Sequence, residues 1–181
     1  HLPDGRNLSF ADLGALTDTA EAELRALQVR PGDRVLVVAE NCPEHAALIL
    51  ACSRVGAWSC GVNARMAPAE IDAFAAKADA RVVFFTAAAS RSAAAHAQRF
   101  AAVDSALPGM QHSPVRADAQ PESGALRDAV AALIFTSGTT GEPKGVMLTH
   151  DALIHFARVS GTSRALGTQD RSYAFVPMTH I

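Results

Sequence analysis

Short apolar runs alternate with longer amphipathic segments through the first half of the chain. Residues 34–40 (RVLVVAE), 57–63 (AWSCGVN) and 81–86 (RVVFFT) are short and rich in β-branched or aromatic residues, which is typical of buried strands. The segments before and between these runs carry apolar residues at helical spacing. The chain is therefore expected to alternate between helix and strand.

Capping residues indicate where the helices begin and end. Ser9 is the expected N-cap of the first helix, and Asn41 with Pro43 is expected to open the second. Gly56 can end the second helix, and Pro68 can open the third. Helices are expected over residues 8–29, 41–56, 67–80 and 90–103.

The alternation of helices with continuous apolar strands predicts an α/β fold, with helices on both faces of a mostly parallel sheet. Pro31 and Gly32 predict a turn before the first strand, because proline presets φ and glycine can adopt φ > 0. Residues 104–128 are rich in Pro, Gly, Ser and Gln and lack periodicity. We expect them to form a long surface connection.

The composition narrows the possible partners. The 181 residues are enough for one domain, and 49% are hydrophobic, so a sizeable core can form. The 16 Lys and Arg residues against 18 Asp and Glu give a net charge of −2. Nucleic acids and anionic membranes select clustered basic residues, so neither is expected as the main partner.

The cysteines and the ends of the chain bear on its compartment and completeness. Cys42, Cys52 and Cys60 are an odd number without a C-x-x-C pair, which favours a reducing cytoplasm. The apolar stretches are too short or too interrupted for a transmembrane segment. The chain begins at His1 rather than Met and stops at Ile181, which predicts a piece of a longer protein.

A polar loop, TSGTTGEPKG at residues 136–145, follows the apolar run 130–135 directly. Glycines let several backbone N–H groups point inward together, hydroxyls add neutral donors, and a lysine adds one positive charge. This combination predicts a loop that holds phosphate. The hydroxyls come from Thr136, Ser137, Thr139 and Thr140, the glycines are Gly138, Gly141 and Gly145, and the charge comes from Lys144.

The loop differs from the P-loop of nucleotide triphosphatases. Lys144 is followed by Gly145 and not by a Ser or Thr that could reach a magnesium ion. Residues 146–149 read as a strand, and Thr149 then caps a helix over 150–160. The arrangement is therefore strand, loop, strand. A polar hairpin without a ligand remains the alternative at this point.

The stretch LIFTSGTTGEPKGVMLTH, residues 133–150, resembles the signature of the adenylate-forming (AMP-binding) superfamily. The resemblance extends to a GDRV strand at residues 32–35 and an NCPE helix start at 41–44, and it weakens over about residues 87–128. It implies ATP-dependent activation of a small carboxylic acid to an acyl-adenylate. ATP, Mg²⁺ and coenzyme A (CoA) are the implied cofactors, with CoA as the thiol that then takes the acyl group.

The same resemblance implies roles for the loop residues. The residues that would contact the β- and γ-phosphates of ATP are Thr136, Ser137, Gly138, Thr139, Thr140, Gly141 and Lys144. Lys144 would also act catalytically, because its charge offsets the charge that develops on departing pyrophosphate.

A second stretch, FVPMTHI at residues 175–181, resembles the P-[LM]-[FY]-H segment of the acyl- and aryl-CoA synthetase branch. Pro177, Met178 and His180 match, and Thr179 stands where an aromatic residue is usual. The resemblance places His180, the second implied catalytic residue, at the wall between the acid pocket and the nucleotide. Residues 173–181 contain no acidic side chain that could hold a substrate ammonium group, which favours a simple organic acid over an amino acid.

The resemblance implies that residues 1–181 are the N-terminal portion of an AMP-binding domain, incomplete and without the C-terminal domain. Such a portion is expected to be inactive alone. Its histidines show no ligand cluster, and His150 and His155 lie five residues apart, so no metal ligand is predicted. The alternatives are a non-catalytic nucleotide-binding module and a domain that loads an amino acid onto a carrier protein. A P-loop phosphotransferase is a more distant one.

Overall fold

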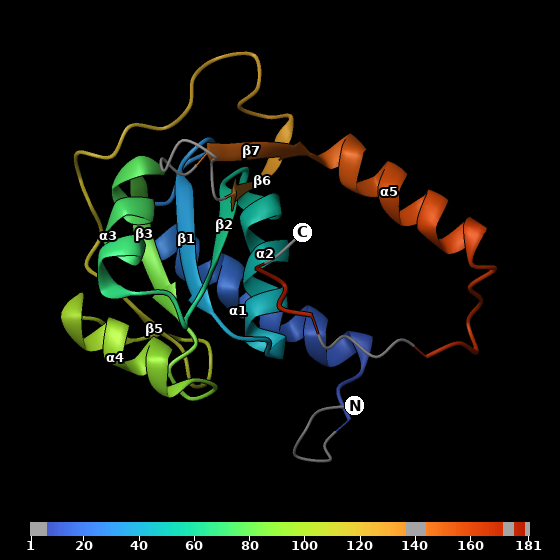
Figure 1. Ribbon diagram of the computed structural model, residues 1–181, viewed down its shortest axis with the longest axis horizontal. Coiled ribbons are helices and arrows are strands. Elements are labelled where there is room, and N and C mark those ends of the chain that lie inside the picture. Colours follow the sequence, from blue (N-terminus) through green and yellow to red (C-terminus); the bar gives the residue numbers. More distant parts are fainter. Residues whose placement is uncertain (1–6, 137–143, 172–175, 180–181) are drawn as a thin grey trace.

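The centre of the molecule is a twisted sheet (Figure 1). The computed structural model describes residues 7–136, 144–171 and 176–179. Within these residues seven strands form one sheet in the order β4-β5-β3-β1-β2-β6-β7. Their bounds are β1 (Arg34–Ala39), β2 (Trp58–Asn63), β3 (Ala80–Phe85), β4 (Val103–Asp104), β5 (Gln111–His112), β6 (Val130–Thr136) and β7 (Lys144–Thr149).

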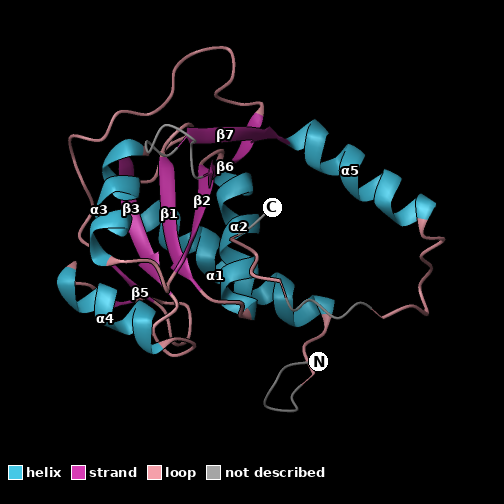
Figure 2. Cartoon of the chain, viewed as in Figure 1, coloured by secondary structure: helices cyan, strands magenta, loops and turns pink. Residues whose placement is uncertain are grey.

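The four central strands, β3, β1, β2 and β6, are parallel, and the outer strands β5, β4 and β7 pair antiparallel. Helices α1 and α2 cover one face of the sheet, and α3 and α4 cover the other (Figure 2). The predicted fold class is confirmed. The helices are α1 (Phe10–Ala26), α2 (Pro43–Val55), α3 (Pro68–Lys77), α4 (Arg91–Arg99) and α5 (His150–Ser163).

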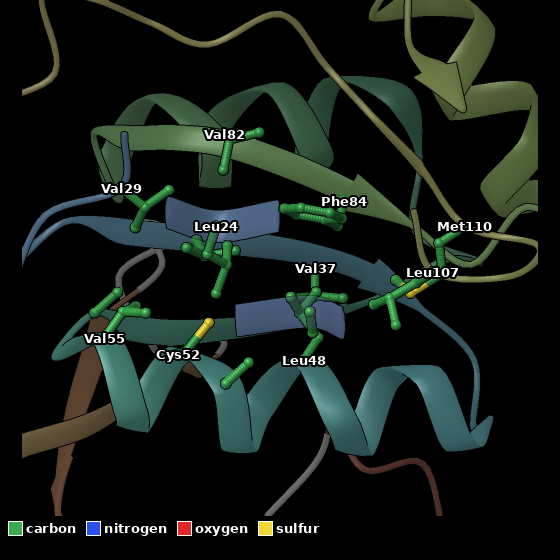
Figure 3. Close-up of a cluster of buried hydrophobic side chains, with 14 of the residues drawn as sticks. Leu24, Val29, Val37, Leu48, Cys52, Val55, Val82, Phe84, Leu107 and Met110 are labelled. Atoms are coloured by element: carbon green, nitrogen blue, oxygen red, sulfur yellow. The ribbon is translucent and has the colours of Figure 1, made fainter. Parts of the chain in front are cut away.

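Strand β1 contributes to a core on each side of the sheet. Val35 and Val37 pack with Leu48 and other residues of α1 and α2 (Figure 3), whereas Leu36 packs with Ile71 and other residues of α3 and α4. Successive side chains of a strand point to opposite faces, so a strand between two helical layers must be apolar at every position. This explains the continuous run that the sequence shows.

The turn before β1 ties three segments together. Gly32 has φ +83°, as the sequence predicts. Its N–H donates to the carbonyl of Gly56, at the end of α2, at 2.8 Å, and its own carbonyl accepts from the Glu122 N–H at 2.9 Å. A glycine is needed here, because a Cβ would lie 2.4 Å from the Glu122 carbonyl oxygen.

The connection over residues 104–128 differs from the prediction of a surface loop. Gln111 and His112 form β5 and pair with β3, and Leu107 and Met110 are buried. The prediction was wrong here because two-residue strands carry no periodicity. They are stabilised by pairing with a strand distant in sequence rather than by their own pattern.

The start of α2 also differs from expectation. The N-cap is Cys42, in extended conformation and without a side-chain cap hydrogen bond, and not Asn41. The first helix does begin as predicted, with Ser9 in a reciprocal capping box with Asp12. The side chain of Asn41 is used elsewhere, at the candidate site.

Candidate functional site

The carboxyl ends of the parallel strands β1 and β2 lie side by side. The chain leaves β1 for α2 on one face and leaves β2 for α3 on the other face. Where adjacent parallel strands send their connections to opposite faces, ligands bind outside the carboxyl ends. The polar residues that follow β1 and β2 are therefore candidate site residues.

Glu40, directly after β1, is held in a polar network. Its carboxylate accepts from the Arg65 guanidinium at 3.1 and 3.2 Å and from the Ser90 hydroxyl at 3.2 Å. Its backbone N–H donates to the Thr86 hydroxyl at 3.1 Å. The hydrogen bonds from Arg65 lower the pKa of Glu40. The carboxylate stays charged and keeps the loops after β1, β2 and β3 together.

Asn41 joins the carboxyl end of β1 to the segment 176–179. Its Nδ2 donates to the Val176 carbonyl at 2.9 Å, and its Oδ1 accepts from the Met178 N–H at 2.8 Å. The side chain thus pairs with this segment much as a neighbouring strand would. In Figure 1 the red C-terminal segment returns to the body of the molecule beside α2.

The predicted phosphate loop connects two paired strands. Thr136 ends β6 and Lys144 begins β7, and the two residues lie opposite each other in the antiparallel ladder. The Thr136 hydroxyl donates to the Lys144 carbonyl at 3.5 Å, and both side chains are exposed. The two predicted strands that flank the loop are present and pair with each other. Ser137, Gly138, Thr139, Thr140 and Gly141 lie outside the described residues.

A pocket of about 410 Å³ lies beside this hairpin. Phe135, one residue before Thr136, and Thr179, one residue before His180, both line it. The two stretches that the sequence singled out therefore meet in one cavity. Its other walls come from β2, α3 and the loop between them, at Gly61, Val62, Asn63, Arg65, Met66, Glu70 and Phe74.

The pocket combines an apolar body with polar groups. The rings of Phe74 and Phe135 pack at a centroid distance of 4.7 Å, and Thr179 lies so close to β2 that a Cβ on Gly61 would be 3.3 Å from its Cγ2. The Thr179 Oγ1 is buried and has no hydrogen-bond partner in the part of the chain that the structure describes. Glu70 at the rim caps α3 by accepting from the Ala67 N–H.

Sequence reasoning did not find Asn41 and Phe135 as site residues. Asn41 stands two residues before Pro43, where it resembles a helix cap, and its partners are 135 and 137 residues away. Phe135 belongs to an apolar strand and carries no polar signal. His180 was predicted as a pocket residue and lies outside the described residues.

No metal-binding cluster is found among the described residues. Over residues 7–136, 144–171 and 176–179, no group of three or more His, Cys, Asp or Glu side chains could hold a metal ion. Cys42, Cys52 and Cys60 are free thiols, and burial raises the pKa of each. They are accordingly poor nucleophiles.

The chain matches the model of a known protein family. The family model described as "AMP-binding enzyme" matches residues 2–181. The chain belongs to this family. Fatty acid–[acyl-carrier-protein] ligase MmaC of Mycobacterium marinum is 32% identical to it over 185 residues, covering 96% of the chain and 35% of that protein. 4-Coumarate–CoA ligase 3 of Oryza sativa subsp. japonica is 36% identical over 157 residues, covering 83% and 28%.

A solved structure has a similar fold. The ATP-bound crystal structure of MatB from Rhodopseudomonas palustris superimposes with a TM-score of 0.73 at 28% identity. That alignment covers 98% of this chain and 37% of MatB. The chain therefore spans about a third of the length of the relatives that it matches.

Proposed function

We propose that this AMP-binding chain is the N-terminal part of an acid–thiol ligase that activates a small carboxylic acid with ATP. The observation that carries the proposal is the hairpin of β6 and β7. Thr136 and Lys144 face each other at its base, and the hydroxyl- and glycine-rich segment 137–143 joins them. The relatives named as 4-coumarate–CoA ligase and fatty acid–carrier protein ligase support the same class of reaction.

The proposed reaction has two steps. A carboxylate oxygen of the acid attacks the α-phosphorus of ATP, and the bond from that phosphorus to the bridging oxygen breaks. Pyrophosphate leaves, and an acyl-adenylate remains. A thiol then attacks the acyl carbon and releases AMP.

In this proposal the chain contributes to the first step mainly by positioning. Thr136 through Gly141 and Lys144 hold the β- and γ-phosphates, and the Lys144 ammonium offsets the charge that develops on departing pyrophosphate. His180 stands at the wall between the acid and the nucleotide. Mg²⁺ would accompany the phosphates and neutralise part of their charge when bound.

Replacing Lys144 tests the phosphate role. We expect Lys144→Ala in the full-length protein to slow acid-dependent pyrophosphate release by about 100-fold, because one preorganised charge on the leaving group is lost. Lys144→Arg, which keeps the charge, is the matched control and should retain more activity. Lys144 is exposed, so both variants should fold. Unchanged pyrophosphate release in Lys144→Ala would exclude the phosphate role.

The proposed function has two versions, which differ in the thiol that accepts the acyl group. CoA is the acceptor that we favour, as in the name of the 4-coumarate–CoA ligase relative. The MmaC relative is named for an acyl-carrier protein, so the full-length enzyme should be assayed with both thiols after acyl-adenylate formation. An amino-acid-loading enzyme, the remaining alternative, would instead release pyrophosphate only with amino acids.

We also propose that the 181-residue polypeptide is inactive by itself. The 181-residue polypeptide alone should show no acid-dependent pyrophosphate exchange, because the chain spans only about a third of its relatives. A non-catalytic nucleotide-binding module would bind ATP without releasing pyrophosphate in the full-length protein too.

The three free cysteines fit a reducing cytoplasm. In the described residues no helix is both long and apolar enough to cross a bilayer.

A further inference from the structure

The hairpin of β6 and β7 is joined to the rest of the sheet by little backbone pairing. Among the described residues, β6 pairs with β2 at a single residue pair, Ala132 with Ser59. Beyond this pair, β6 pairs with β7 and with no other described strand. Strand β7 is the outer strand of the sheet, and its residues 144–147 are exposed. Backbone pairing with β2 therefore does not reach the end of the hairpin that carries Thr136 and Lys144.

Two side chains join this end of the hairpin to the core beneath α3. Leu133 and Phe135 pack against the buried cluster that contains Phe74 of α3. The rings of Phe135 and Phe74 lie 4.7 Å apart, centroid to centroid, with their planes at 40°, which is a favourable arrangement for two aromatic rings. Side chains alternate along a strand, so the next residue, Thr136, points to the other side and is exposed. Phe135 thus anchors the hairpin one residue before Thr136.

The second strand of the hairpin is adapted to the same packing. Gly145 lies opposite Phe135 in the ladder, and a Cβ on Gly145 would be 2.9 Å from the Cδ1 of Leu133. The missing side chain therefore leaves room for Leu133 to pack closely against β7. Lys144, the residue before Gly145, lies opposite Thr136. Because these neighbours are paired, a shift of Phe135 would move Thr136 and Lys144 together.

We propose that Phe135, packed on Phe74, is a positioning residue for ATP, because this aromatic contact sets where Thr136 and Lys144 meet the β- and γ-phosphates. The inference rests on the proposed function. Each ring acts through these two polar residues rather than on the nucleotide itself. Charges and donors stabilise a leaving group best when they are held in place beforehand. The contact supplies the rigidity that pairing with β2 does not.

The test measures the binding of ATP and of AMP to the full-length protein by calorimetry, without acid, so that no turnover occurs. Phe74→Leu keeps an apolar side chain and removes the ring contact. It should raise the Kd for ATP by roughly fivefold. The Kd for AMP should stay unchanged, because AMP lacks the two phosphates that the hairpin holds. Phe135→Leu, which removes the other ring, should give the same result.

Phe100→Leu is the matched control. The rings of Phe100 and Phe85 lie 5.4 Å apart and belong to the same side of the sheet, but Phe100 stands at the end of α4 and not at the hairpin. Losing this ring pair should leave both Kd values unchanged. Equal losses of ATP affinity in Phe74→Leu and Phe100→Leu would indicate a general loosening of the core and overturn the inference. Equal losses of ATP and AMP affinity in Phe74→Leu would do the same.

Combining Phe74→Leu with Lys144→Ala separates this inference from the proposed function. If the ring contact acts through Lys144, Phe74→Leu should weaken ATP binding less in the Lys144→Ala background than in the wild type. Equal weakening in both backgrounds would overturn the positioning role and leave the phosphate role of Lys144 intact. Wild-type ATP affinity in Phe74→Leu and Phe135→Leu would have the same meaning. Unchanged ATP affinity in Lys144→Ala would overturn both proposals.

Discussion

His45 in α2 is a buried histidine whose ring nitrogens have no hydrogen-bond partner among the described residues. Its exposed fraction is 1%. Burial lowers its pKa from 6.5 to about 4, because the charged form loses its hydration. The imidazole is therefore neutral in the folded protein at neutral pH.

This burial predicts a pH dependence of stability. The unfolded chain takes up a proton at His45 near pH 6.5, whereas the folded chain does so only near pH 4. Above pH 6.5 the titration of His45 therefore does not lower the free energy of unfolding. As the pH drops from 6.5 toward 4, it lowers that free energy by roughly 3 kcal/mol at most. We expect His45→Leu to lose less stability than wild type between pH 7 and 4.5 in urea unfolding.

The exposed His155 supplies the control for this measurement. His155→Gln should keep the wild-type slope of stability against pH, because the group is in solvent. Carboxylates contribute to acid lability in all three proteins alike. An identical slope for His45→Leu and wild type would contradict the assignment.

Asn41 is hydrogen-bonded to the segment 176–178 and does not cap α2. Asn41→Ala removes two hydrogen bonds to the segment 176–178, each worth about 1 kcal/mol. We expect the variant to raise KM for the acid by roughly tenfold, with ATP affinity unchanged. The measurement is pyrophosphate release against acid concentration in the full-length protein.

Asn41→Asp is the informative companion variant. It keeps the acceptor for the Met178 N–H but places a carboxylate oxygen against the Val176 carbonyl. It should therefore be impaired as well, since two acceptors then face each other. A wild-type KM in Asn41→Ala would show that the hydrogen bonds between Asn41 and the segment 176–178 do not serve acid binding.

At the scale of elements, the turn at Gly32 joins the end of α2 to the long connection before β6. Gly32→Ala would force an alanine to φ +83° with its Cβ 2.4 Å from the Glu122 carbonyl oxygen. We expect a loss of about 2 kcal/mol or more in the free energy of unfolding. Chemical denaturation of the purified variant measures it.

The same substitution at Gly14 in α1 should have the opposite sign. A Cβ at Gly14 meets nothing within 4 Å, and alanine is favoured over glycine inside a helix by up to about 1 kcal/mol. Gly14→Ala should thus stabilise the protein slightly. Equal effects of the two substitutions would show that φ and close approach do not decide the cost at Gly32.

At the scale of the whole molecule, β7 and α5 leave several large apolar side chains exposed to solvent. No described residue of α5 is buried, and the helix projects away from the sheet (Figure 1). Monomeric proteins rarely expose so much large apolar surface. The large apolar side chains that β7 and α5 expose are Val146, Met147, Leu153, Ile154, Phe156 and Val159.

These exposed side chains predict the behaviour of the 181-residue polypeptide in isolation. It should self-associate and bind a hydrophobic dye, and Phe156→Glu should reduce both effects, because Phe156 in α5 is 69% exposed. Phe10→Glu is the matched control, since Phe10 is 93% exposed at the start of α1, away from β7 and α5 in sequence. A monomeric polypeptide that binds no dye in sedimentation and fluorescence measurements would contradict this prediction.

The local features of this protein were determined by its sequence alone. The periodicity of apolar residues, the Ser9 and Thr149 caps and the glycine turn at Gly32 each depend on neighbours a few residues away. The strand–loop–strand arrangement around Thr136 and Lys144 was predicted for the same reason. Short-range sterics and hydrogen bonds decide such features, so a pattern in sequence is enough to predict them.

Only the tertiary structure decided which distant residues meet. It gave Asn41 its partners at Val176 and Met178, paired β5 with β3, and placed Phe135 and Thr179 in one pocket. These contacts join residues tens of positions apart, and they form only when the strands take their order in the sheet. No local pattern encodes that order, because it depends on how both faces are covered at once.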